Sequence, residues 1–349
     1  MPSEMVRRIL SITSVSNGVR QGAISSAILF AIYIDELLKI LKRSRLGCHI
    51  HTVFLGAFIF ADDIFLLSAS RAGLQSLVNI CDEFASEHNL KFGTNADPTK
   101  SKTKCIVFAK KTQKNSNLAP ITLNGQELPW VKKVTHLGNV LEEDNSMKMD
   151  LALKRGKFIG KVNSLLQEFH YVDSGMLMTL VNVYASSFYG SSLWDLMSKD
   201  AEKLYRTWNV TVRNVYRLDR RTHRNLIEPL SNCLHLKGML LSRFVSFHRE
   251  LLKSRKFSVR FLARLQQNDL RTSAGRTLHS LLEECRIFGY DLEKLTPGRV
   301  KSCVRYAPVT SEWEVKLAKE LLALRDRQLV VNGFGHDEVE EMFNYICTN

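Results

Sequence analysis

The chain has 349 residues, of which 45% are hydrophobic and 24% are charged, and this composition is typical of a folded globular protein. It argues against a disordered chain, and no uninterrupted apolar run reaches the ~18 residues of a membrane span. The net charge of +14, from 49 Lys and Arg against 35 Asp and Glu, fits either a nucleic-acid binder or a solvated basic surface.

The basic excess is concentrated in the middle of the chain. Residues 151–276 contain 22 basic and 9 acidic side chains, whereas residues 277–349 contain 9 and 12. Residues 1–150 are nearer to balance, with 18 and 14. The charge is therefore not a uniform coat, and a basic partner-binding segment is expected in the middle.

The seven cysteines are scattered and include no Cys-x-x-Cys pair. Their number is odd, which argues against a disulfide scaffold and against a zinc ribbon. Cys233 and His235 resemble half of a metal site, but no second pair stands at zinc-knuckle spacing, so core or loop positions are expected. The cysteines favour a reducing compartment.

The first 150 residues are expected to mix helices and strands. Apolar residues at helical spacing predict helices over 21–41 and 74–87. Runs rich in Phe, Ile and Leu predict strands over 52–60 and 64–68, on either side of two aspartates. Further strands are predicted over 105–109 and 135–141, and Asn124-Gly125 fits a hairpin turn because both residues tolerate positive φ.

From Asp150 onward the pattern becomes helical, after a polar joint at residues 145–150. Apolar stripes are centred on residues 158–169 and 204–215, a further helix is predicted over 240–252, and another over 313–327. The expected fold class is α+β followed by an all-α basic region. Phe158, Phe169 and Trp208 fall on the stripes and are expected in the core.

Two basic faces accompany these stripes on other sides of the helices. The first face comprises Lys154, Arg155, Lys157 and Lys161, and the second comprises Arg206, Arg213, Arg217 and Arg220.

Asp62 and Asp63 are adjacent carboxylates between apolar runs. Such a pair is costly unless it reaches water or a cation, and Mg²⁺ takes oxygen ligands. The alternative is an exposed turn, where Asp is simply a favourable residue.

The sequence around this pair resembles the reverse transcriptases of non-LTR, LINE-like retrotransposons. Phe60-Ala61-Asp62-Asp63 matches the aromatic-x-Asp-Asp signature of that family, with a strand expected on each side. The block from Asn17 to Leu37 resembles the Arg-Gln-Gly turn and the helix that precede the signature. Lys102-Thr103-Lys104 and Thr135-His136-Leu137-Gly138 resemble later blocks, the last being the primer grip. The similarity covers residues 17–142.

Two departures from the family pattern stand out. Ala27 occupies the position of a family proline, which a helix accepts readily. The family's first catalytic aspartate lies upstream of the Arg-Gln-Gly block, and residues 1–16 offer only Glu4 as an acid. We therefore expect the back part of a polymerase palm (1–149), a thumb-like region (150–276) and a helical extension (277–349), with the fingers and first palm block absent.

The resemblance implies roles for individual residues. Asp62 would be the main ligand of two Mg²⁺ ions, or of Mn²⁺ in their place, and Asp63 an auxiliary one. Phe60 would lie near the primer end, Arg20, Gln21 and Gly22 near the templating base pair, and Lys102 or Lys104 near the leaving pyrophosphate. The ordinary alternatives are a helix-start turn at Gly22, a cap at Gln21 and solvated lysines.

The resemblance also implies RNA template, DNA primer and deoxynucleoside triphosphates as partners, with the eight basic residues of both faces on the duplex backbone. Three hypotheses follow: an RNA-directed DNA polymerase fragment inactive in isolation, a non-catalytic nucleic-acid-binding remnant, or a piece that completes a polymerase in trans with its missing N-terminal portion. Family behaviour implies an intracellular location, in cytoplasm and nucleus, and no membrane.

Overall fold

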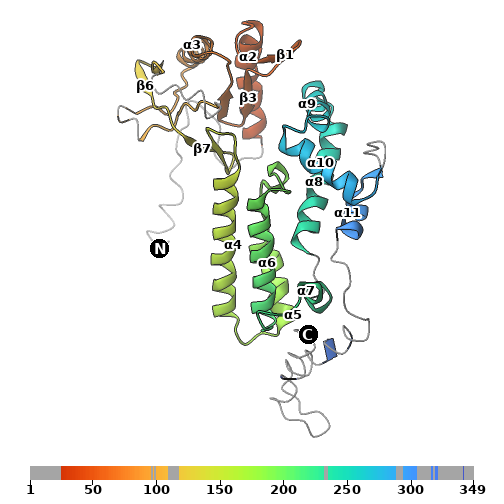
Figure 1. Cartoon of the computed structure of the whole chain (residues 1–349). Helices are drawn as coiled ribbons and strands as arrows, with labels where there is room; N and C mark the ends of the chain where they lie inside the picture. Colours follow the sequence, from red (N-terminus) through yellow and green to blue (C-terminus); the bar gives the residue numbers. More distant parts are fainter. Residues whose placement is uncertain are drawn as a thin grey trace, which may run out of the picture. The chain divides into compact units, whose positions relative to one another are not determined.

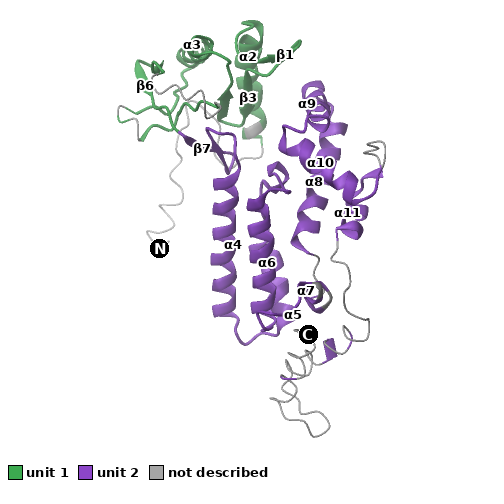
Figure 2. Ribbon diagram, viewed as in Figure 1, with its two compact units in different colours: residues 1–131 green, residues 132–349 purple. Residues whose placement is uncertain are grey.

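The computed structural model describes residues 25–95, 97, 100–108, 118–231, 235–287 and 294–304, together with 316, 319, 320 and 341. Helices and small antiparallel strand pairs make up this part of the chain (Figure 1), which confirms the α+β class. Two compact units divide the chain, residues 1–131 and 132–349 (Figure 2). Among the described residues, no helix has the length and apolar character needed to cross a bilayer.

Unit 1 is built from helices α2 (Ser26–Arg43) and α3 (Arg71–Glu87), which pack on short strand pairs. Apolar side chains spaced along both helices share one core with the strands, because Leu37, Leu41, Leu77 and Phe84 are buried together. Ser70 caps α3 by accepting a 3.1 Å hydrogen bond from the Gly73 amide.

The single strand predicted over 52–60 is wrong, since the chain forms two strands there. Strand β2 (Val53–Phe54) pairs with β1 (His49–Ile50), and β3 (Ala57–Phe60) pairs with β4 (Asp63–Leu66). The switch of partner occurs at Gly56, where a Cβ would lie 3.2 Å from the Cα of Gly47. Two stretches of backbone meet closely at this point. A Cβ on Gly47, whose φ is +84°, would lie 2.9 Å from the Cα of Gly56, which favours glycine there.

The predicted Asn124-Gly125 turn is confirmed. It joins β5 (Ile121–Leu123) to β6 (Gln126–Leu128), with φ of 55° and 71° at the two turn residues. The strand expected over 105–109 is not formed by its described residues. Cys105 makes only one bridge, to Trp130, and Val107 and Phe108 are exposed.

Unit 2 opens with a hairpin of β7 (Lys133–His136) and β8 (Asn139–Glu142), where one strand was predicted. Leu137 and Gly138 form the turn, with φ of 45° and 75°. Their positive φ angles reverse the chain inside the stretch that was predicted to be a single strand.

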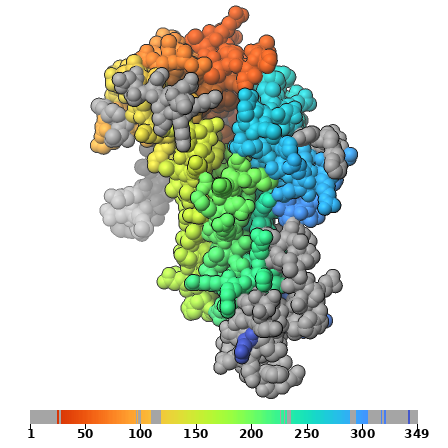
Figure 3. All heavy atoms as spheres, in the orientation of Figure 1, coloured from red at the N-terminus to blue at the C-terminus, as the bar shows by residue number. Residues whose placement is uncertain are grey.

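The rest of unit 2 is helical (Figure 1), and Figure 3 shows the outer surface of these helices. The helices share one large core. Phe158 and Trp208 are buried and Phe169 is partly buried, as predicted. The predicted 313–327 helix lies outside the described residues. The elements are α4 (Lys148–Glu168), α5 (Ser174–Leu180), η3 (Val181–Ala185), η4 (Ser191–Leu193), α6 (Lys199–Val215), α7 (Arg224–Ser231), α8 (Leu236–Lys253), α9 (Phe257–Gln267), α10 (Ser273–Glu284) and α11 (Pro297–Cys303).

The packing boundary falls before the β7–β8 hairpin, because this hairpin is bonded to α4. The Val140 amide donates to the Asp150 carboxylate over 3.1 Å. The functional boundaries expected after residues 149 and 276 remain predictions.

Candidate metal and nucleic-acid sites

The two aspartates lie at the end of the β3–β4 hairpin. Phe60 pairs with Asp63, and Ala61 and Asp62 form the turn between them. Ala61 has φ of 52°, a left-handed conformation that a residue with a Cβ adopts at some cost. Both carboxylates are exposed, so neither carries the penalty of burial.

Strand alternation decides which side chains accompany the aspartates. Ala57, Ile59, Ile64 and Leu66 turn toward the core formed by α2 and α3. The opposite face carries Phe58, Phe60, Asp63 and Phe65, with Phe60 65% exposed. The sequence therefore places an open carboxylate beside exposed aromatic rings, on a hairpin held from behind by its apolar face.

The chemistry of this pair fits a hard divalent cation in part. Two carboxylates supply oxygen ligands of the kind that Mg²⁺ binds. Across the described residues, however, no group of three or more His, Cys, Asp or Glu side chains is placed to hold a metal ion. Asp62 and Asp63 are thus suited to be part of a metal site that needs further oxygen ligands.

The structure describes two of the other five residues predicted near the active site. Arg20, Gln21 and Gly22 lie outside the described residues. Lys102 and Lys104 are exposed in a loop of unit 1, where the Lys102 amide donates to the Gly93 carbonyl over 3.1 Å. The roles assigned to these five residues remain predictions.

The eight basic residues predicted to contact a nucleic-acid backbone fall into two groups. Four use their cationic groups on backbone carbonyls of this chain, namely Lys154 on Gly138 and Tyr189, Lys161 on Tyr184, Arg213 on Thr222, and Arg217 on His170. Arg155, Lys157, Arg206 and Arg220 form the second group, in which Lys157, Arg206 and Arg220 are exposed. The second group is better suited to bind phosphates.

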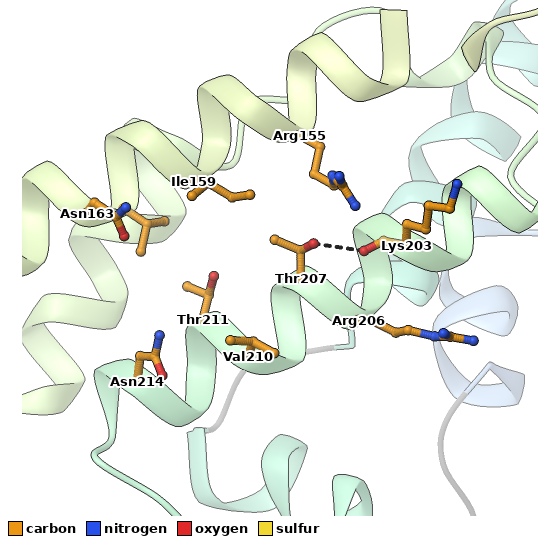
Figure 4. A pocket seen from close by; sticks show the side chains of 10 residues that line it. Arg155, Ile159, Asn163, Lys203, Arg206, Thr207, Val210, Thr211 and Asn214 are labelled. Atoms are coloured by element: carbon orange, nitrogen blue, oxygen red, sulfur yellow. Dashed lines mark hydrogen bonds between the residues drawn. The ribbon is translucent and has the colours of Figure 1, made fainter. Parts of the chain in front are cut away.

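A groove of about 380 Å³ lies between α4 and α6 (Figure 4). Arg155 from α4 and Lys203 and Arg206 from α6 line it, beside apolar Ile159 and Val210. The amides and hydroxyls that also line the groove were not predicted from the sequence. The apolar and polar pattern of a single helix does not show which of its faces lies against a second helix. These polar residues are Asn163, Thr207, Thr211 and Asn214.

A buried carboxylate was also missed. Asp150 is 1% exposed and accepts hydrogen bonds from the Trp194 indole (2.8 Å) and the Val140 amide (3.1 Å). The Lys154 ammonium lies 3.9 Å from it and is itself mostly buried. In the sequence, an acid in the first turn of a helix suggests only a favourable helix-dipole position. The two hydrogen-bond donors, Val140 and Trp194, are 10 and 44 residues away from Asp150 in the sequence.

Comparisons with known proteins match part of the chain. Residues 6–141 match the family described as reverse transcriptase (RNA-dependent DNA polymerase). A similar relative is the Retrovirus-related Pol polyprotein from type-2 retrotransposable element R2DM of Drosophila melanogaster, 32% identical over 123 residues. That alignment covers 34% of this chain and 11% of the relative. Both matches confirm the resemblance drawn from the aspartate signature and its neighbouring blocks.

Proposed function

We propose that the chain is part of an RNA-directed DNA polymerase of the non-LTR retrotransposon type, because residues 6–141 match the reverse-transcriptase family and a similar relative is a retrotransposon Pol polyprotein. The observation that carries the proposal is the position of Asp62 and Asp63, exposed at the end of a hairpin whose other side is anchored in the core. The partners of this polymerase would be an RNA template, a DNA primer and deoxynucleoside triphosphates.

Asp62 and Asp63 would hold Mg²⁺, together with oxygen ligands from outside the described residues. A divalent cation in such a site activates the primer 3′-hydroxyl and offsets the charge of the phosphates. The hairpin fixes the two carboxylates, and the exposed ring of Phe60 offers an apolar surface to the sugar or base of the primer end. Lys102 or Lys104 would stabilise the leaving pyrophosphate.

The basic helical region would hold the template–primer duplex. Arg155, Lys157, Arg206 and Arg220 would bind phosphates, and Lys203 would add a cation at the α4–α6 groove. Contacts of this kind are independent of sequence and weaken steeply with salt. Arg155→Ala and Arg206→Ala should each lower the salt slope of duplex binding by about one, and an unchanged slope would remove this role.

Primer extension on an RNA template, with Mg²⁺ or Mn²⁺, tests the catalytic part. If the chain extends the primer, Asp62→Asn should abolish extension, while Asp35→Asn, an exposed carboxylate on α2, should leave it intact. Mn²⁺ binding followed by electron paramagnetic resonance gives a second readout: Asp62→Asn should weaken it and Asp35→Asn should not. Equal Mn²⁺ binding by both variants would exclude the hairpin as the metal site.

The second candidate is a nucleic-acid-binding protein without catalysis. It is favoured by the fact that the described residues bring no third metal ligand to the aspartate pair. Duplex binding without primer extension would support it, and extension that depends on Asp62 would exclude it. Adding a separate fingers and first-palm fragment would test completion in trans, which fails if no extension appears. Imaging of a tagged chain would test the expected cytoplasmic and nuclear location.

A further inference from the structure

The segment from Tyr184 to Tyr189 presents two aromatic side chains to solvent. Tyr184 is 62% exposed and Tyr189 is 61% exposed, while Ala185, Ser186 and Phe188 between them are buried. The segment begins in the π-helical turn η3, a conformation found often at functional sites. Two large aromatic rings left in water by a fixed backbone are unlike the surrounding core, where aromatic side chains are packed away.

Three cationic side chains fix the backbone of this segment. Lys161 donates to the Tyr184 carbonyl over 2.9 Å, and Lys154 donates to the Tyr189 carbonyl over 3.2 Å. From α8, Arg243 donates to the Ser187 carbonyl over 2.9 Å. Because Lys154 and Lys161 are two helical turns apart, the carbonyls of the two tyrosines are separated by on the order of 10 Å along α4.

Buried contacts anchor the same segment from behind. The Phe188 ring lies 5.2 Å from that of Phe158 and 6.5 Å from that of Trp194, both in the core of unit 2. The Tyr189 ring is itself approached by the Lys154 ammonium, 5.2 Å from its centroid. The backbone that carries the tyrosines is therefore held in place before any ligand binds, which reduces the entropy lost on binding.

The charge beside the two rings is positive. Lys154, Lys157 and Lys161 lie on one face of α4 at helical spacing, and Lys157 is exposed. A surface that combines exposed aromatic rings on a fixed backbone with an exposed lysine matches the chemistry of unpaired nucleotides, whose bases stack and whose phosphates are anionic. Bases within a duplex already stack on each other and offer no face to a tyrosine.

We propose that Tyr184 and Tyr189 form a stacking platform for single-stranded nucleic acid. The two rings would each take the face of one unpaired base, and the exposed Lys157 of α4 would lie near the phosphates. This goes beyond the proposed duplex binding, because it assigns single-stranded nucleic acid to two tyrosines that the duplex proposal does not use.

Fluorescence anisotropy with labelled oligo(dT) on the full chain tests the proposal. Tyr184→Leu and Tyr189→Leu should each weaken binding at least about fivefold, the lower end of the effect of one stacked base. Tyr184→Phe and Tyr189→Phe, which keep the ring, should bind like the wild type. A duplex of the same length should bind the Leu variants and the wild type equally.

Two controls locate the effect. Tyr171→Ser removes another exposed ring, near the far end of α4, and should not change oligo(dT) binding. An oligonucleotide of abasic sugar-phosphate units should bind the Leu variants and the wild type equally, because it has no base to stack. Both Leu variants replace exposed side chains, and circular dichroism will check that they fold.

Several results would overturn the platform. Unchanged oligo(dT) binding by the Leu variants would leave the tyrosines as a surface for a protein partner instead. An equal loss of abasic binding would mean that the substitutions act through the backbone or the lysines. Normal duplex binding by Arg155→Ala with the Leu effects intact would overturn the duplex proposal alone, whereas weakened duplex binding by Arg155→Ala without any Leu effect would overturn the platform alone.

Discussion

Asp150→Asn should destabilise unit 2 by about 1.5–3 kcal/mol. The wild-type carboxylate accepts from the Trp194 indole and the Val140 amide, one on each oxygen. Asparagine has one oxygen, so one of the two buried donors would face an amide NH₂ in place of an acceptor. A hydrogen bond to a charged group contributes about 1.5–3 kcal/mol, which gives the expected loss. Lys154 would also lose its carboxylate neighbour.

The assay is urea unfolding followed by far-ultraviolet circular dichroism. A double-mutant cycle with Trp194→Phe identifies the cause, because phenylalanine removes the indole N–H but retains an apolar ring. In the Trp194→Phe background, Asp150→Asn should cost at least about 1 kcal/mol less than in the wild type. Glu168→Gln, an exposed carboxylate in the last turn of α4, is the matched control and should change stability by less than about 0.5 kcal/mol.

Two outcomes would refute this reasoning. A cost of Asp150→Asn equal to that of the control would mean that the carboxylate does not connect the hairpin to the helical core. Strict additivity with Trp194→Phe would mean that the loss comes from another contact.

Further predictions concern single positions. Gly190 has φ of 82°, and a Cβ there would collide with the Asn139 side chain, so Gly190→Ala should lower the free energy of unfolding by roughly 1–3 kcal/mol. Gly156 lies in open space on α4, so Gly156→Ala should raise the free energy of unfolding by up to ~1 kcal/mol. A more stable Gly190→Ala variant together with a less stable Gly156→Ala variant would contradict both assignments. Ala61→Gly should raise the melting temperature of unit 1 by relieving about 1 kcal/mol of left-handed strain, whereas a fall would show that Ala61 is unstrained. Burial lowers the pKa of His235 from 6.5 to about 4, so the folded state favours the neutral imidazole. The stability that comes from this neutral imidazole is fully present above pH 6.5 and is lost as the pH falls through about 4, by about 3 kcal/mol in all. Between pH 7 and 4, the free energy of unfolding of His235→Gln should therefore fall less than that of the wild type. An equal fall in both proteins would show that His235 is not a source of the acid sensitivity.

The positions of helices could be predicted from the sequence where a single apolar stripe along the helix is buried in the core. The stripe of Leu204, Trp208 and Val212 is buried in α6, whose bounds differ little from the predicted pattern. The N-terminal half of α2 behaved differently. Ile28 and Ile32 are among the apolar residues at helical spacing in the predicted 21–41 helix, yet they are 63% and 68% exposed. Spacing alone reports that a face is apolar and does not report what covers it.

Turns and tertiary polar contacts were harder to predict. Asn124-Gly125 was found because both residues are common at positive φ, whereas Leu137-Gly138 was missed because Leu is a strand residue and rarely occupies that region. Asp62 and Asp63 could be predicted as a candidate site because apolar runs flank them and Phe60 precedes them in the family signature. The connection of Asp150 to Trp194 could not be predicted, since no local pattern specifies a hydrogen bond across 44 residues.

The bond between Asp150 and the β7–β8 hairpin has a mechanical consequence. Because the carboxylate belongs to the first turn of α4, the hairpin and the 21-residue helix are joined at the root of a rod about 30 Å long. Along its length this rod is packed into the core of unit 2, through Leu151, Phe158 and Val162. A load applied to the Leu137-Gly138 tip would thus pass through Asp150 into the helical core, which resists it.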